Sequence, residues 1–164
     1  MESSVEKLKI EDVLQDRGIY VGPTVGVSML PMLKTGRDTV VIVKKENRLS
    51  PLDVALYKRG DGAYVLHRVL SVTEKGYIIR GDNCYVDEIV PEYAVLGVLR
   101  EFYQKDKHIL CTDGKYLAYV RKRLKTYKSR RRRVMFKRKV RSFLGKVKRG
   151  VKKVFGIKNK GESK

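Results

Sequence analysis

Short apolar segments rich in β-branched residues, separated by turn residues, dominate the chain between residues 39 and 111. The segments are 39–43, 54–57, 64–70, 77–80, 94–99 and 108–111, and the turns at 59–62, 74–76 and 81–83 contain glycine with aspartate or glutamate. Asp61-Gly62 favours a tight hairpin, because glycine adopts positive φ without steric cost. Strands of this length and spacing predict a mainly β body with antiparallel pairing.

Helical patterns are found at both ends of the chain. Residues 3–16 predict a short helix, capped by Ser3 or Ser4 and ended near Gly18. Toward the C-terminus, apolar residues recur at the spacing of one helical face, with lysine and arginine filling the other face. These apolar residues are Phe136, Val140, Phe143, Leu144, Val147, Val151, Val154 and Phe155. We therefore expect a basic amphipathic helical tail.

Positive charge is confined to that tail. Residues 121–164 contain 21 of the 38 lysine and arginine residues and one of the 18 acidic residues. Residues 1–120 contain 17 basic and 17 acidic residues, so their formal net charge is zero. The sequence predicts a neutral domain over 1–120 and a basic tail over 121–164, and any anionic partner is expected to bind the tail.

Three interpretations of residues 121–164 compete. A basic amphipathic helix binds an anionic membrane surface, with its apolar residues in the interface. The same charge would bind nucleic acid in a salt-dependent way, and a solvated, partly disordered tail is the third alternative. The regular apolar stripe favours the membrane, because phosphate binding alone does not need it.

Several kinds of site and segment are not expected. Residues 1–6 do not resemble a secretory signal, and no run of about 18 apolar residues predicts a membrane span. The sequence therefore predicts a cytoplasmic or peripheral membrane location. Cys84 and Cys111 have no metal-ligand spacing, and two free thiols are a simpler interpretation than one bridge. We expect no metal and no cofactor.

Three residues are candidates for chemistry. Ser28 lies in Gly26-Val27-Ser28-Met29-Leu30-Pro31, a bend that can expose a nucleophilic hydroxyl. His67 shares one face of its strand with the apolar Val65 and Val69 and could act as a base, whereas His108 is predicted to lie at the surface. Asp82 follows the strand 77–80. Each has an ordinary structural alternative: a loop serine, a buried neutral imidazole and an aspartate that caps its own turn.

The order of these motifs resembles the type I signal peptidase family and the related LexA-type peptidases. The resemblance covers about residues 20–100 and rests on Gly26-x-Ser28-Met29-x-Pro31, His67-Arg68-Val69 and Arg80-Gly81-Asp82-Asn83, with 53–57 as a further match. It implies a signal-peptidase-like antiparallel β fold, with Ser28 as nucleophile. One subtype of the signal peptidase family uses a lysine base, whereas the endoplasmic-reticulum and archaeal subtype has histidine at that position. With histidine at position 67 this chain resembles the second subtype, which implies His67 as base.

The acid is less well defined by the resemblance. Asp82 is the first choice to orient His67, and either Asp87 or Glu88 could supply the second acid of the histidine subtype, with Glu88 preferred. The Ser28 N–H is a candidate oxyanion donor. Some family members use a serine hydroxyl two residues earlier, but Gly26 occupies that position here, so the second donor stays unassigned.

The sequence also departs from both families. Classical signal peptidases have a transmembrane anchor before the serine, and here only a short charged segment precedes it. The 27 residues before Ser28 leave no room for the DNA-binding domain of LexA-type repressors, and they contain no Ala-Gly self-cleavage site.

The function expected from the sequence is a serine endopeptidase that cleaves an extended peptide or leader segment. Two alternatives remain open. One is a non-catalytic peptide-binding or membrane-adaptor module on the same fold. The other is a nucleic-acid-binding protein that acts through its basic tail.

Overall fold

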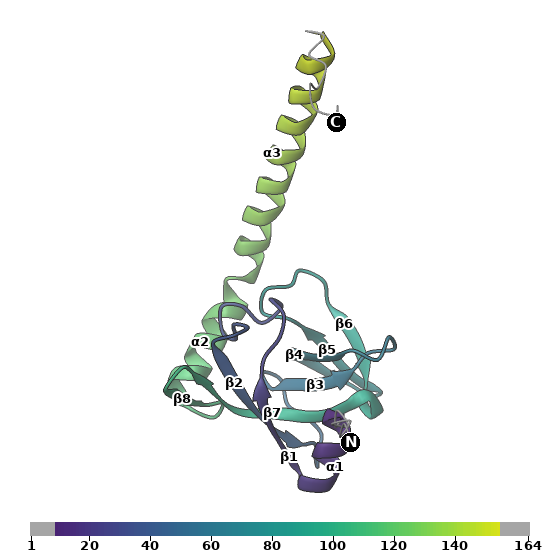
Figure 1. The fold of residues 1–164 in the computed structure, drawn as a ribbon, viewed down its shortest axis with the longest axis vertical. Coiled ribbons are helices and arrows are strands. Elements are labelled where there is room, and N and C mark those ends of the chain that lie inside the picture. The colour runs from purple at the N-terminus through teal and green to yellow at the C-terminus, as the bar shows by residue number, and fades with distance from the viewer. Residues whose placement is uncertain (1–8, 155–164) are drawn as a thin grey trace, which may run out of the picture. The chain divides into compact units, whose positions relative to one another are not determined.

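The protein is described by a computed structural model that covers residues 9–154. In this range the chain forms eight strands in one sheet, with antiparallel pairing throughout, a short N-terminal helix and two C-terminal helices (Figure 1). The strands are β1 (Ile19–Pro23), β2 (Asp38–Lys44), β3 (Val54–Lys58), β4 (Tyr64–Thr73), β5 (Gly76–Arg80), β6 (Glu88–Pro91), β7 (Val95–Gln104) and β8 (Lys107–Leu110). The predicted mainly antiparallel β class is confirmed.

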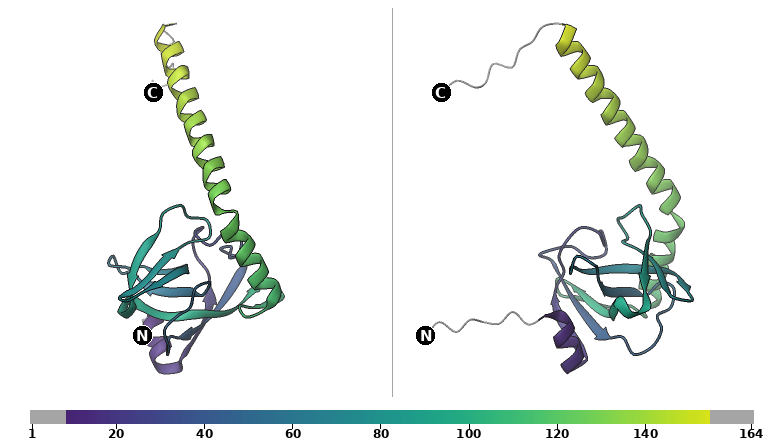
Figure 2. Two further views of the ribbon diagram at one scale, coloured as in Figure 1. Left: turned by 180° about the vertical axis from the view of Figure 1, so that it is seen from behind. Right: turned by 90° about the vertical axis from the view of Figure 1, so that its right-hand side faces the viewer.

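Strand β7 pairs with three other strands of the sheet. The strand order is β1-β2-β7-β3-β4-β5-β6, and β8 pairs with β7 beside this path. One edge of β7 pairs with β2, and the other edge pairs first with β3 and then with β8. Bulges interrupt the register between Val41 and Ile42 and between Leu56 and Tyr57. Because a bulge bends its strand and increases local twist, the sheet is strongly twisted (Figure 2).

The core of the β body lies between these strands. One cluster of buried residues packs around β3, β4 and β5. Its members are Leu49, Ala55, Tyr57, Val69, Tyr77, Ile79, Val90 and Val95. Tyr57 is 2 % exposed and belongs to this cluster, so its ring is fixed by packing and its hydroxyl has a defined position.

The β3–β4 hairpin forms where Asp61-Gly62 predicts it. Gly62 has a φ of 85°, its N–H donates to the Arg59 carbonyl at 2.8 Å, and the Arg59 N–H donates to the Ala63 carbonyl at 2.9 Å. Strand β6 was not predicted. It has four residues and ends on Pro91, so it has neither the length nor the alternation that identifies a strand from sequence.

Helix α1 (Ile10–Arg17) covers the second half of the predicted N-terminal helix. It ends as predicted at Gly18, whose φ of 70° is left-handed and whose N–H donates to the Leu14 carbonyl at 3.0 Å. The proposed caps Ser3 and Ser4 lie outside the described residues.

Two further helices follow the sheet, α2 (Gly114–Lys125) and α3 (Tyr127–Val154), with a single residue between them. The chain divides into two compact units after Arg123, close to the expected boundary at residue 120. Helix α2 was not predicted, although the buried pair Tyr116 and Val120 has the i, i+4 spacing of a helical face. No helix within residues 9–154 is both long and apolar enough to cross a membrane.

Candidate functional site

Ser28 lies in the loop that joins β1 to β2, residues 24–37, which we call the serine loop. Hydrogen bonds from Asn83 attach this loop to the turn after β5. The Asn83 N–H donates to the Ser28 carbonyl at 2.7 Å, and its side-chain amide donates to the Val27 carbonyl at 3.1 Å. Met29 is buried next to the serine. The Ser28 backbone is therefore held while its side chain remains partly accessible.

His67 lies on β4, opposite Ala55 of β3, and is 3 % exposed. The predicted position of His67 among buried residues is confirmed. Its Nδ1 lies 3.0 Å from Glu88 Oε1. Burial lowers the pKa of His67 below its ordinary value, and the nearby Glu88 carboxylate opposes part of that effect. A neutral imidazole that donates from Nδ1 to the carboxylate leaves Nε2 as an acceptor.

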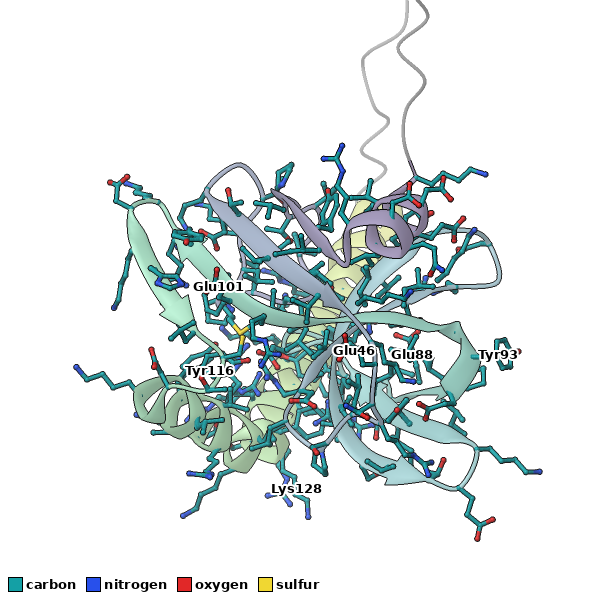
Figure 3. All side chains as sticks on the ribbon, turned by 90° about the horizontal axis from the view of Figure 1, so that it is seen from below. Glu46, Glu88, Tyr93, Glu101, Tyr116 and Lys128 are labelled. Atoms are coloured by element: carbon teal, nitrogen blue, oxygen red, sulfur yellow. The ribbon has the colours of Figure 1, made fainter. Side chains whose placement is uncertain are left out.

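Glu88, at the start of β6, is held by two further groups. The Tyr57 hydroxyl donates to Glu88 Oε2 at 2.8 Å, and a guanidinium nitrogen of Arg59 lies 3.4 Å from the same oxygen. The Tyr57 hydroxyl also lies 3.3 Å from His67 Nδ1. Burial and the adjacent carboxylate raise the pKa of Tyr57, so this phenol stays protonated and acts as a donor. Tyr93, which is 87 % exposed, stands at the edge of the β body in Figure 3, whereas the Glu88 side chain is 30 % exposed.

Gly81 is the point where the serine loop and His67 meet. A Cβ on this residue would lie 2.7 Å from the Ser28 carbonyl oxygen, 2.9 Å from His67 Nε2 and 2.8 Å from Cys84 Sγ. No side chain fits into such a space without moving its neighbours. The absence of a side chain at Gly81 therefore lets the Ser28 carbonyl and His67 Nε2 both pack against this residue.

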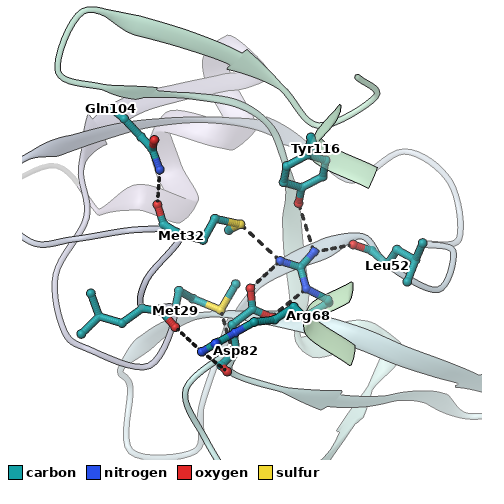
Figure 4. A network of polar contacts seen from close by, with 9 residues as sticks. Met29, Met32, Leu52, Arg68, Asp82, Gln104 and Tyr116 are labelled. Carbon is teal, nitrogen blue, oxygen red and sulfur yellow. Dashed lines mark hydrogen bonds and ion pairs between the residues drawn. The ribbon is translucent and has the colours of Figure 1, made fainter. Parts of the chain in front are cut away.

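Asp82, the first choice for the acid, is paired with a buried arginine. Its carboxylate forms a two-bond ion pair with the fully buried Arg68, with Nε to Oδ1 at 2.8 Å and the second nitrogen to Oδ2 at 2.7 Å (Figure 4). That Asp82 orients His67 therefore stays a prediction, because both of its carboxylate oxygens bond to Arg68. Glu88 is the carboxylate hydrogen-bonded to the imidazole, and Asp82 neutralises a buried arginine.

Arg68 was not recognised from the sequence, where a charged residue inside a strand suggests an exposed face. All five of its N–H groups donate hydrogen bonds: besides the two to Asp82, they reach the Leu52 carbonyl at 2.9 Å, the Tyr116 hydroxyl at 3.0 Å and Met32 Sδ at 3.2 Å. Asp82 and the tyrosine hydroxyl are the signals that could have identified a buried cation. The network joins β4, the serine loop and α2.

Arg123 of α2 reinforces the same region. One of its guanidinium nitrogens donates to the Leu30 carbonyl at 3.0 Å and to the Asp82 carbonyl at 3.1 Å. The serine loop and the turn after β5 are thus cross-linked from the helix as well as from Asn83.

Asp87 and His108 bond to groups other than the imidazole. Asp87 forms an ion pair with Arg80 at 2.7 Å and is exposed. His108 is exposed, as predicted, and its ring stacks on Tyr103 while Nε2 lies 2.8 Å from Glu101. Cys84 and Cys111 are both free thiols. Among the described residues, no group of three histidine, cysteine or acidic side chains could hold a metal ion.

A cleft of about 570 Å³ adjoins the site. Ser28, His67 and Glu88 line it together with Cys84 and a largely apolar wall. That wall includes Tyr20, Val25, Met29, Leu33, Val40, Ile42, Leu56 and Leu66. Burial raises the pKa of the Cys84 thiol, which favours its protonated form. The cleft can accommodate an extended segment with apolar side chains.

The arrangement provides most of what acyl transfer requires: a hydroxyl, an imidazole with an acceptor nitrogen and a carboxylate that fixes its tautomer. Among the described residues, however, Ser28 Oγ forms no hydrogen bond with His67. Such bonds are often long without substrate and shorten when it binds.

Comparisons with protein-family models, with curated proteins and with solved structures found no match to this chain. The site is therefore interpreted from its own geometry.

Proposed function

We propose that this chain is a serine endopeptidase in which Ser28 is the nucleophile, His67 the general base and Glu88 the carboxylate that orients the base. The proposal is supported by the surroundings of the imidazole: Glu88 Oε1 lies 3.0 Å from His67 Nδ1, and a Cβ on Gly81 would lie within 3 Å of both His67 Nε2 and the Ser28 carbonyl oxygen. A carboxylate on one ring nitrogen and a serine beside the other is the arrangement that activates a hydroxyl.

The reaction follows from these positions. Ser28 Oγ attacks the peptide carbonyl carbon, and its proton passes to His67 Nε2. The imidazolium is stabilised by Glu88 and then gives its proton to the departing amine as the carbon–nitrogen bond breaks. Water, deprotonated by the same nitrogen, hydrolyses the ester. The Ser28 N–H is our candidate donor to the oxyanion.

An extended peptide is the substrate that the cleft favours. Strand β1 is the terminal strand of the sheet, and the 21–27 segment exposes Val21, Val25 and Val27. Residues 23–26 of this segment line the cleft. A peptide could add to such an edge by backbone hydrogen bonds and place its side chains against the apolar wall. The resemblance to signal peptidases supports leader segments with small side chains near the scissile bond.

A non-catalytic peptide-binding module is the second candidate. The observation in its favour is that Ser28 Oγ is not hydrogen-bonded to His67 in this structure. A binding module would use the same cleft and the same edge of β1, and it would leave the bound peptide intact.

A mixture of synthetic peptides incubated with the full chain separates the two functions. Mass spectrometry of the products should reveal cleavage by wild type and by Ser50→Ala, which changes an exposed serine outside the cleft. Ser28→Ala should bind the same peptides without cutting them. Cleavage that survives in Ser28→Ala would overturn the proposal, and binding without cleavage by wild type would establish the second candidate.

A further inference from the structure

Helix α3 combines dense positive charge with exposed apolar side chains. Its 28 residues include 14 lysine and arginine residues and no aspartate or glutamate. Five large apolar side chains of the helix are exposed: Phe136 at 69 %, Val140 at 39 %, Phe143 at 66 %, Leu144 at 58 % and Val147 at 45 %. Exposed phenylalanine and leucine are costly in water, so these side chains need an apolar environment to cover them.

Between Phe136 and Val147 the two kinds of side chain are separated around the helix. With 3.6 residues per turn, the five exposed apolar residues fall within an arc of about 100°. The basic residues between Phe136 and Phe143 all fall outside that arc: Lys137, Arg138, Lys139 and Arg141. Gly145, which sequence propensity disfavours in a helix, lies within α3 without interrupting it. Of the predicted stripe, the side chains of Val151 and Val154, and the whole of Phe155, lie outside the described residues.

We propose that α3 binds along the surface of a membrane rich in anionic lipid, with the arc around Phe143 in the acyl boundary and the basic face among the headgroups. Charge complementarity identifies the partner, because lysine and arginine beside an apolar stripe match an anionic headgroup layer above hydrocarbon. The helix is about 42 Å long at 1.5 Å per residue, but its basic residues prevent it from spanning. It therefore lies in the plane of the interface. This proposal is independent of the peptidase chemistry.

The apolar arc is also what distinguishes a membrane from nucleic acid. Phosphate backbones are bound through charge alone, and that binding falls steeply with salt. Two exposed phenylalanines and a leucine on one side of the helix would contribute nothing to it. Insertion of the same side chains below the headgroups would supply a part of the affinity that salt does not screen.

The chain contains no tryptophan, so a single introduced tryptophan reports its own environment. Phe143→Trp places the tryptophan in the apolar arc. The matched control, Ser142→Trp, places it at the adjacent residue on the basic side of the helix and leaves the charge unchanged. Both are made in the full chain and mixed with vesicles of phosphatidylcholine, with and without a quarter of phosphatidylserine. We expect a blue shift for Phe143→Trp with the anionic vesicles and little for Ser142→Trp. Equal shifts in the two variants, or none in either, would overturn the proposal.

A second pair of variants tests the partner. Phe136→Ser with Phe143→Ser removes apolar surface, and Arg138→Gln with Lys139→Gln removes two charges. Sedimentation with the anionic vesicles should weaken by tenfold or more in both, whereas retention on a polyuridine column should weaken only in the charge variant. Vesicle binding unaffected by the serine pair would show that charge alone drives it, which favours nucleic acid. Circular dichroism of the full chain verifies that each variant keeps its helix.

Discussion

Among the carboxylates in and after the turn that follows β5, Asp82 and Glu88 have different buried partners. Asp82 is buried against Arg68, and Glu88, whose side chain is 30 % exposed, is bonded to His67. A carboxylate that pairs with a buried arginine contributes to folding, because its removal leaves an uncompensated charge in the core. A carboxylate on a ring nitrogen can fix the tautomer of the imidazole, which is the role that we propose for Glu88. Sequence order alone could not separate them, since both follow the same strand.

Substitution at each carboxylate should therefore have opposite consequences. Glu88→Gln should lower kcat by about 10²–10⁴-fold with little change in the free energy of unfolding, because the wrong tautomer of His67 becomes accessible. Asp82→Asn should reduce the free energy of unfolding by about 3–5 kcal/mol. Peptide cleavage and urea unfolding measured on both variants provide the comparison.

The reverse pattern would return Asp82 to the role that the sequence suggested. A loss of kcat in Asp82→Asn at unchanged stability, with an active Glu88→Gln, would mean that the Glu88 contact has no part in the reaction.

The Tyr57 hydroxyl donates a hydrogen bond to Glu88, and phenylalanine at this position could not donate one. Because burial lowers the pKa of His67 below 6.5, activity should rise with pH through that lowered value, as the imidazole becomes neutral. In Tyr57→Phe the carboxylate loses its 2.8 Å donor and attracts the imidazolium more strongly. The acidic limb of the pH–rate profile should then move to higher pH, with a fall in kcat of about tenfold.

Tyr103→Phe is the matched control, because this hydroxyl belongs to the ring that stacks on the surface residue His108. A purely structural role for Tyr57 would lower stability and leave the acidic limb where it is in wild type.

At the scale of elements, the site depends on how closely the turn after β5 approaches the serine loop. A methyl group on Gly81 would lie under 3 Å from two backbone or ring atoms of the site. Gly81→Ala should therefore displace the Ser28 carbonyl from His67, reduce kcat/KM by tenfold or more and cost about 1–3 kcal/mol of stability. Peptide cleavage and thermal unfolding measure the two effects.

Gly60→Ala in the β3–β4 hairpin is its control, because a Cβ there has no neighbour within 4 Å. If Gly81→Ala retains full activity, the close approach is not required for the reaction.

The elements that sequence predicted are those with a local signal. The hairpin at Asp61-Gly62 and the end of α1 at Gly18 each depend on one residue whose backbone conformation is unusual. Strand β6 and helix α2 depend on long-range contacts instead: β6 exists because it pairs with β5, and Tyr116 of α2 packs against Arg68. The position of Glu88 beside His67 is of the second kind, since it requires β6 to lie along β5.

In the molecule as a whole, a β body with a cleft and a basic helix belong to two compact units, and we propose a different function for each. The change from a neutral segment to a basic one at about residue 120 could be predicted from the sequence, because it follows from the numbers of basic and acidic residues alone. We expect Phe136→Ser with Phe143→Ser to leave cleavage of a free peptide in solution unchanged, because neither residue lines the cleft. Cleavage is measured as the kcat/KM of this variant without vesicles. A loss of more than about threefold would mean that α3 contributes to the reaction.

If Ser28 is a nucleophile activated by His67, it should react with a fluorophosphonate reagent. Such a reagent forms a covalent bond with an activated serine, and the tryptic peptide 18–34 contains Ser28 as its single serine. We predict an adduct on that peptide in wild type and at least about a hundredfold slower labelling in His67→Ala, because the base is then missing. If wild type is not labelled on this peptide, or if His67→Ala is labelled equally fast, Ser28 is not a nucleophile activated by His67.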